Sequence, residues 1–304
     1  MAAPSGVRRR HAEAGMAAGV VGRRHGATSC EVADSTLGPR DAVAAALGRA
    51  ADGVYTCARC VGGAARQLAF HERRLAAGCA RVGSPAPAPG EAAAALADAE
   101  REFRARFPGD AARPVLVTLF AGPEGGGLRW HAMALPAAAP SVPLVAISAA
   151  RTAKGNREGL PGVKNAAWVL DRVPLEQERD RLGAQELVML DAAGERVLEG
   201  LVTNVVVVRR DGTLQTAPDG VLGGSMRELV IAAAIELRLP LQLAAPTLAD
   251  ARRGLWADLV LASATRPVVR AERVLLPDGA DVALAAEEHP STARLRAWVV
   301  AQLA

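Results

Sequence analysis

The sequence has very few lysines. Lysine and arginine together number 36, and Lys154 and Lys164 are the only lysines among them. Arginine supplies surface charge as well as lysine does, but its guanidinium stays protonated and cannot serve as a nucleophilic amine. A lysine kept in such a chain is therefore expected where the amine itself is required.

The two lysines lie in different surroundings. Lys154 stands in the polar run Arg-Thr-Ala-Lys-Gly-Asn-Arg, which fits residual surface charge. Lys164 stands just before Asn-Ala-Ala-Trp-Val-Leu, which predicts the start of a partly buried helix. Lys164 is therefore the candidate for covalent chemistry, and residual surface charge is the alternative.

Cysteines, aromatic residues and long apolar runs are also scarce. Four cysteines in 304 residues do not make a disulfide framework. Cys57 and Cys60 form a single CxxC, and no second CxxC or histidine pair follows at the spacing of zinc ligands, so no metal site is predicted. No apolar run reaches the length needed to span a membrane.

The net charge of +4 comes from dispersed arginines, several of them within the first 24 residues. The sequence has no basic stripe with interleaved aromatic residues, which is the pattern of a nucleic-acid surface. We therefore expect neither a nucleic-acid partner nor a membrane partner.

Length and composition predict a globular chain of one large or two medium domains. Residues 1–36 are rich in alanine, glycine and arginine and poor in acids, which predicts a disordered tail or an organelle transit peptide. A transit peptide would direct the protein to a chloroplast or mitochondrion, and otherwise we expect it in the cytoplasm. Residues 37–150 are expected to form a small α+β domain, 151–159 a linker, and 160–304 a larger domain.

Strands and helices are expected to be mixed along the chain, which favours an α+β architecture over a regular βαβ repeat. The helix expected at 91–107 has acids at its start and bases toward its end, matching the helix dipole. We predict strands at 54–61, 115–121, 128–135 and 144–149, and helices at 41–51, 91–107 and 168–183.

The stretch from Leu160 to Arg227 holds two further candidates beside Lys164. Glu199 ends a short strand and is followed by apolar and hydroxyl residues, with Thr203 and Asn204 at the entry of the next strand. A carboxylate in such surroundings has a raised pKa unless a cation pairs with it. An ordinary glutamate at a strand end is the alternative.

The second candidate is the glycine-rich turn Gly223-Gly224-Ser225-Met226, which leads into a helix. The first amide groups of a helix have no partner within it, and together with the helix dipole they bind anions. These three candidates together match the needs of pyridoxal 5'-phosphate. They offer an amine for its aldehyde, a carboxylate for its ring nitrogen and backbone donors for its phosphate. A glycine before a helix is common, so the turn alone does not decide the matter.

The order of these motifs resembles the class IV aminotransferases, the pyridoxal-phosphate family that includes branched-chain and D-amino acid aminotransferases and 4-amino-4-deoxychorismate lyase. The closest resemblance is to a plant and algal branch of this family. The motifs that carry it are Lys164, Gly183 to Asp191, Gly194, Glu199-Gly200, Asn204, Asp211-Gly212, Leu214, Thr216, Gly224 to Arg227 and Ala262 to Thr265, with Asp52 to Tyr55 and His71 to Leu75 upstream.

The resemblance implies the two-domain fold of fold-type IV pyridoxal-phosphate enzymes, with the cofactor between the domains and a second subunit completing the pocket in a homodimer. It implies that Lys164 is the Schiff-base lysine, that Glu199 holds the pyridine nitrogen, and that Tyr55 faces the substrate. It further implies a cofactor contact by Thr203 and Asn204. The phosphate would be bound by Arg74, by the backbone amides of Ser225 and Met226, and by Ser263 or Ala264.

Three functions follow from the resemblance. The first is an aminotransferase acting on a small amino acid and a 2-oxo acid. The second is a lyase of the aminodeoxychorismate type that releases pyruvate, because Met226 stands where the aminotransferases commonly carry threonine. The third is a non-catalytic scaffold, because the strand Val117 to Gly122 has no arginine where D-amino acid enzymes bind the substrate carboxylate.

Overall fold

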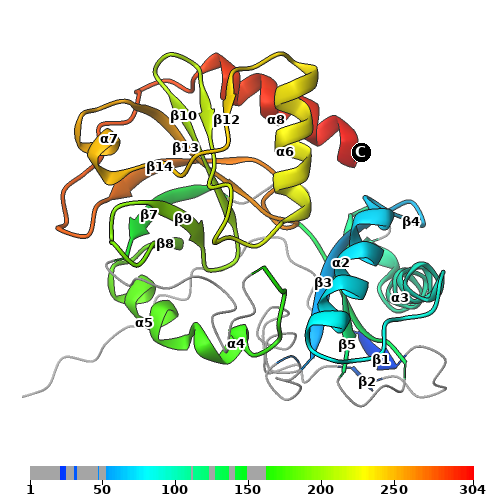
Figure 1. Ribbon diagram of the computed structural model, residues 1–304. Coiled ribbons are helices and arrows are strands. Elements are labelled where there is room, and N and C mark those ends of the chain that lie inside the picture. The colour runs from blue at the N-terminus through cyan, green and yellow to red at the C-terminus, as the bar shows by residue number, and fades with distance from the viewer. Residues whose placement is uncertain are drawn as a thin grey trace, which may run out of the picture.

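The computed structural model describes residues 21–24, 31–32, 47, 53–110, 112–122, 127–136, 141–148 and 162–304. Two β-sheets, one in each half of the protein, organise these residues (Figure 1). No helix in these ranges is both long and apolar enough to cross a membrane.

The first sheet has six antiparallel strands in the order β2-β1-β6-β5-β3-β4. Two helices, α2 (Leu68–Arg81) and α3 (Glu91–Arg106), accompany it. A short 3-10 turn, η1 (Pro108–Asp110), follows α3. The strands are β1 (Val21–Arg24), β2 (Glu31–Val32), β3 (Val54–Val61), β4 (Ala64–Ala65), β5 (Val115–Ala121) and β6 (Arg129–Ala134).

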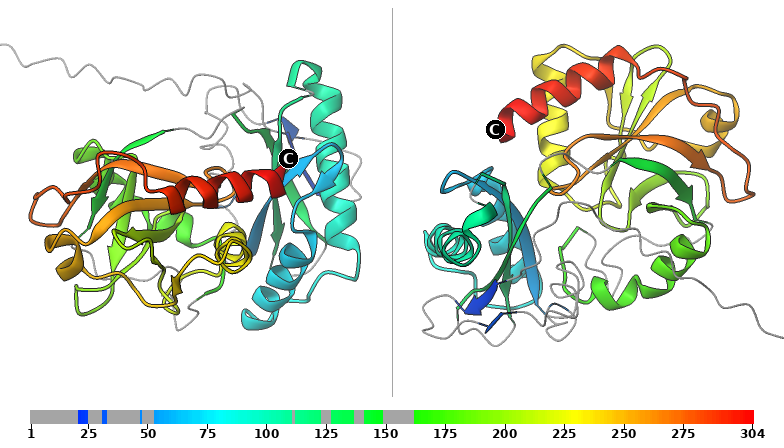
Figure 2. Two further views of the ribbon diagram at one scale, coloured as in Figure 1. Left: turned by 90° about the horizontal axis from the view of Figure 1, so that it is seen from above. Right: turned by 180° about the vertical axis from the view of Figure 1, so that it is seen from behind.

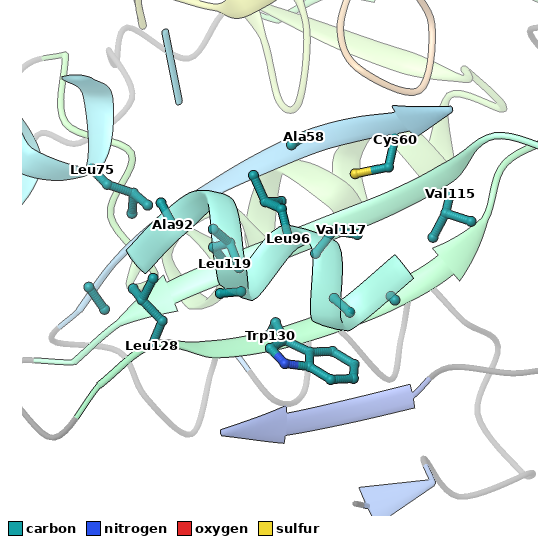
Figure 3. Close-up of a cluster of buried hydrophobic side chains, with 14 of the residues drawn as sticks. Ala58, Cys60, Leu75, Ala92, Leu96, Val115, Val117, Leu119, Leu128 and Trp130 are labelled. Carbon is teal, nitrogen blue, oxygen red and sulfur yellow. The ribbon is translucent and has the colours of Figure 1, made fainter. Parts of the chain in front are cut away.

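The core of the first domain lies between its sheet and helices α2 and α3 (Figure 3). Val54, Ala58 and Cys60 face this core, because successive side chains of a strand point to opposite faces. The same alternation turns Tyr55 and Cys57 to the other face, where they pack against a different cluster. That second face is the one directed toward the second half of the chain.

The second sheet has eight strands in the order β12-β11-β10-β13-β14-β7-β8-β9. Because β9 also pairs with β10, the strands from β10 to β9 close into a ring. The strands are β7 (Val142–Ile147), β8 (Glu186–Leu190), β9 (Val197–Gly200), β10 (Asn204–Arg209), β11 (Leu214–Gln215), β12 (Leu241–Gln242), β13 (Trp256–Ala262) and β14 (Val269–Leu275).

Helices α6 (Ser225–Glu236) and α8 (Pro290–Leu303) pack together against one side of this sheet. Helix α8 runs toward the first domain, where Arg66 donates a hydrogen bond to the carbonyl of Ala304 (Figure 2). The remaining helices are α4 (Trp168–Asp171), α5 (Val173–Arg181) and α7 (Leu248–Arg252).

Several predicted elements are confirmed. The strand at 54–61 is β3, the strand at 115–121 is β5, and the helix at 91–107 is α3. The helix expected at 168–183 is divided at Arg172 into α4 and α5, and Pro174 stands in the first turn of α5, where a missing amide hydrogen costs nothing.

The predicted domain boundary at residue 150 is wrong for one strand. We expected the strand near 144–149 in the first domain, but β7 lies in the second sheet, parallel to both β14 and β8. Apolar periodicity identifies a strand but says nothing about its partners, and these parallel partners are distant in sequence. The chain therefore passes from the first domain to the second before β7.

The prediction of a disordered tail is wrong for residues 21–24 and 31–32. These residues form β1 and β2, and β1 pairs with β6 at the edge of the first sheet. The other residues of the expected tail or transit peptide, the helix at 41–51 apart from Leu47, and the linker at 151–159 lie outside the described residues.

Candidate active site

A small cleft lies where the two halves of the chain meet. It combines one residue of β3 with residues of the α4 segment and of the turn after β9. Its lining residues are Tyr55, Val163, Lys164, Asn165, Trp168, Leu201, Val202 and Leu222.

The backbone of Lys164 is held against the start of β3. The amide of Tyr55 donates to the Lys164 carbonyl at 2.9 Å, and the amide of Ala166 donates to the Gly53 carbonyl at 2.9 Å. Position 53 must be glycine, because a Cβ there would overlap the ring of Phe120. This pairing directs the Lys164 side chain into the cleft, with its Nζ 4.6 Å from the centre of the Tyr55 ring.

The Lys164 amine is easily deprotonated. The residue is half-buried, but protein surrounds the amine closely enough that desolvation lowers its pKa from 10.5 to about 8. The charges of Arg74 and Arg172 also lower this pKa, while Cys57 and Glu199 raise it. The neutral, nucleophilic form is therefore far more populated near pH 7 than for an exposed lysine.

Glu199 is fully buried at the end of β9. One carboxylate oxygen accepts from the Leu222 amide at 3.0 Å, and the other accepts from the Asn204 amide group at 3.2 Å. Asn204 also donates to the Leu222 carbonyl at 2.8 Å. Closure of the strand ring produces this arrangement, because Glu199 and Asn204 are the residues through which β9 and β10 pair.

The glycine-rich turn passes close to Asn204. A Cβ on Gly224 would overlap the Asn204 side-chain oxygen, so only glycine fits there. Gly224 is extended, and its carbonyl accepts the first helical hydrogen bond of α6, from Glu228 at 3.0 Å. The amides of Ser225 and Met226 precede that bond and therefore have no partner within the helix.

Arg74 projects from α2 toward the same region. Its Nε donates to the Thr56 hydroxyl at 3.1 Å, and its guanidinium lies 4.7 Å from the centre of the Phe70 ring. Burial lowers the pKa of Arg74, and none of the described carboxylates forms an ion pair with it. A partly buried cation without a carboxylate partner favours an anionic ligand.

His71 supports Arg74 without adding charge. Its Nδ1 forms a 2.7 Å hydrogen bond with the Thr56 hydroxyl, which also accepts from Arg74. Burial lowers the pKa of His71 to about 3, with a further contribution from Arg74 and Lys164, so His71 is neutral at physiological pH.

The class IV amino-transferase family model matches residues 53–274. The chain belongs to this family. Of the predicted site residues, Tyr55 and Arg74 lie in the first domain, whereas Glu199 and the start of α6 lie in the second. A comparison with curated protein sequences finds no significant match.

Solved structures of similar fold include several aminotransferases. An aminotransferase from Brucella abortus bound to pyridoxal phosphate is 18% identical, with a TM-score of 0.69, over 93% of this chain and 98% of that one. A branched-chain aminotransferase from Thermoproteus uzoniensis is 19% identical, with a TM-score of 0.63, over 83% and 85%. A candidate 4-amino-4-deoxychorismate lyase from Legionella pneumophila is 16% identical, with a TM-score of 0.67, over 83% and 91%. The chain therefore has the fold of the fold-type IV enzymes.

The side chains of four predicted site residues of this class IV chain have other contacts in the structure. The Thr203 hydroxyl donates to Glu186 at 3.1 Å and not to Glu199. The Ser263 hydroxyl lies 3.1 Å from that of Thr265, and Ala264 packs against the first domain. The side chain of Met226 is buried in the core under α6, so only its backbone is left for an anion.

Sequence reasoning missed Cys57 and Arg59. Both share the cleft-facing side of β3 with Tyr55, since they follow it at two-residue intervals. Burial lowers the pKa of Arg59, and its Nε is buried without a hydrogen-bond partner among the described residues. Strand alternation counted from Tyr55 would have found both positions.

The pKa of Lys164 can be measured without any ligand. Competitive labelling of the cofactor-free protein with an amine-reactive reagent, followed by mass spectrometry, should give Lys164 a half-maximal reactivity at about pH 8. Lys154, the only other lysine, provides the internal comparison. A Lys164 profile that still rises near pH 10.5 would contradict the desolvated amine.

Proposed function

We propose that this class IV enzyme is a pyridoxal-phosphate-dependent aminotransferase acting on a small amino acid and a 2-oxo acid, with Lys164 as the lysine that bonds to the cofactor. The observation that carries the proposal is the desolvated Lys164 amine in the cleft, which lies near enough to Glu199 and Arg74 for their charges to act on its pKa. Members of this family use pyridoxal phosphate, and these residues fit its three functional groups.

Each group has a candidate partner on this chain. The bound cofactor supplies a ring that withdraws electrons from the substrate Cα. Glu199, oriented by Asn204 and the Leu222 amide, would hold a proton on the ring nitrogen. Arg74 and the amides of Ser225 and Met226 would bind the phosphate, where helix dipole and guanidinium act together.

The amine of Lys164 has a second role in the proposal. When it is not bonded to the cofactor, Lys164 Nζ would lie close to the substrate as a free base. With a pKa of about 8, it can accept a proton from the substrate Cα and return it, as an efficient general base near neutral pH should. Tyr55, beneath the amine, limits where Nζ can move.

Replacing Lys164 by alanine tests the proposal. After incubation with pyridoxal phosphate and gel filtration, the wild-type protein should keep a visible absorbance band, and Lys164→Ala should lose it. Lys154→Ala is the matched control and should keep the band. A retained band in Lys164→Ala would exclude Lys164 as the bonding residue, and a colourless wild type would favour the non-catalytic scaffold.

Arg59 is our candidate for the substrate carboxylate. Its position on β3 is about 13 Å from Tyr55 along the strand, at 3.3 Å per residue, and an arginine side chain spans much of that distance. Its buried, unpartnered Nε has the character of a group that awaits an anion. This would replace the arginine that the strand Val117 to Gly122 lacks.

Replacing Arg59 by methionine keeps the apolar stem and removes the charge. We expect KM for the 2-oxo acid to rise by about tenfold to a hundredfold, the range of one hydrogen bond to a charged group. The visible band should not change, because Arg59 contacts no part of the cofactor in this proposal. Unchanged kinetics in Arg59→Met would remove Arg59 from substrate binding.

The elimination reaction of aminodeoxychorismate lyase is the second candidate. It is favoured by Met226, whose side chain offers no hydroxyl to the phosphate, and by the similar fold of the Legionella protein. Pyruvate release from 4-amino-4-deoxychorismate without an added amino acceptor would identify the lyase. Amino transfer that requires a 2-oxo acid would identify the aminotransferase.

A further inference from the structure

Glu186 is a buried carboxylate that lies behind the cleft wall. It is 1% exposed at the first position of β8. One oxygen accepts from the Leu201 amide at 2.9 Å, and the other accepts from the Thr203 hydroxyl at 3.1 Å and from Arg266 at 3.2 Å. A single side chain therefore holds two loops that are far apart in the sequence.

The first of these loops forms one wall of the cleft. Leu201 and Val202 line it directly, and the Leu201 carbonyl accepts from the indole of Trp168, another lining residue, at 2.8 Å. The loop closes on itself through the Gly200 amide and the Thr203 carbonyl at 2.9 Å. Hydrogen bonds with the Glu186 carboxylate and with the Trp168 indole therefore hold this loop in position.

The second loop, from Ser263 to Arg266, lies between β13 and β14 and contacts the first domain. Its ends are joined by reciprocal backbone hydrogen bonds at 2.7 and 3.0 Å. Ala264, at its tip, packs against Leu116, Met133 and Leu135 of the first domain. Because Arg266 is 7% exposed and paired with Glu186, this loop cannot shift without separating two buried charges.

Gly200 permits this arrangement. A Cβ at this position would lie 2.9 Å from the Glu186 carboxyl carbon and would overlap the Thr203 hydroxyl. The glycine beside Glu199 is therefore required by the close approach of the Glu186 carboxylate to the turn. The same backbone then carries Glu199 on one side and the cleft-lining Leu201 on the other.

We propose that Glu186 is a positioning residue that fixes both loops around the substrate, although it lines no part of the cleft. Its carboxylate sets the cleft wall at Leu201 and Val202 and, through Arg266, the approach of the Ser263–Arg266 loop to the first domain. Substrate binding depends on Glu186 for this reason, while retention of the cofactor depends on Lys164, Glu199 and Arg74. The kinetic part of this inference rests on the proposed function.

Glu186→Gln tests the geometry in the cofactor-free protein. The amide keeps the size of the side chain but replaces one acceptor oxygen with a donor. In one orientation the NH2 group cannot accept from Thr203 or Arg266, and in the other it cannot accept from the Leu201 amide. Hydrogen exchange at the Leu201 amide and in the 263–266 loop should accelerate by about tenfold or more. Unchanged exchange in both loops would overturn the proposal.

Asp258→Asn is the matched control. Asp258 is also a fully buried carboxylate, paired with Arg270 and accepting from the His289 amide at 2.9 Å and from Thr292. It lies on β13, contacts the start of α8 and lines no part of the cleft. Asp258→Asn should destabilise the fold but leave exchange at Leu201 unchanged, which separates positioning from general stability.

Kinetics of the cofactor-loaded enzyme provide the second measurement. Glu186→Gln should keep the visible band and raise KM for the amino donor by about tenfold, while Asp258→Asn should leave KM unchanged. Equal KM values in Glu186→Gln and wild type would overturn the kinetic claim. A wild type without transfer activity would instead defeat the proposed function, and the exchange result would still decide the role of Glu186.

Thr203→Val provides a milder variant if Glu186→Gln fails to fold. It removes one of the three contacts and nearly preserves the shape of the side chain, so exchange at Leu201 should accelerate less than in Glu186→Gln. Faster exchange throughout the second sheet in Thr203→Val, without preference for the two loops, would mean a structural role alone and would also overturn the proposal.

Discussion

The site depends on the pairing of the Lys164 segment with the start of β3. Val54 pairs with Ala121 on one side and with Asn165 on the other, so the segment at 164–166 extends the first sheet although it follows β7 of the second sheet in the chain. The first sheet thereby fixes the position of the Lys164 backbone. The pairing of β9 with β10, which closes the second sheet into a ring, fixes the position of Glu199. The relative placement of the two sheets sets the distance across the site.

Charge balance follows from the same placement. The first domain contributes Arg74 and the second half of the chain contributes Lys164. Glu228 raises the pKa of Arg74, and Glu199 raises that of Lys164. Burial weakens both cations, and Thr56 and the neutral His71 offer Arg74 only polar contacts. An anionic ligand would relieve this excess, which is the physical reason that a phosphorylated cofactor suits the cleft.

Much of the site could be predicted from composition and local pattern. The rarity of lysine identified Lys164, and a carboxylate and a glycine turn at local spacing identified Glu199 and Gly224. The sheet to which β7 belongs and the contacts of Glu186 could not be predicted, because both depend on partners brought together by the closed strand ring. The homodimer, the organelle and the plant and algal branch remain predictions.

The scarcity of aromatic residues has a practical consequence. Tyr55 is the only tyrosine in the chain, and it lies directly beneath the Lys164 amine. Isotopic labelling of tyrosine therefore places a single magnetic reporter at the reaction centre, with no background from the rest of the protein. Such a probe would register changes in the ionisation of the neighbouring amine without any engineered substitution.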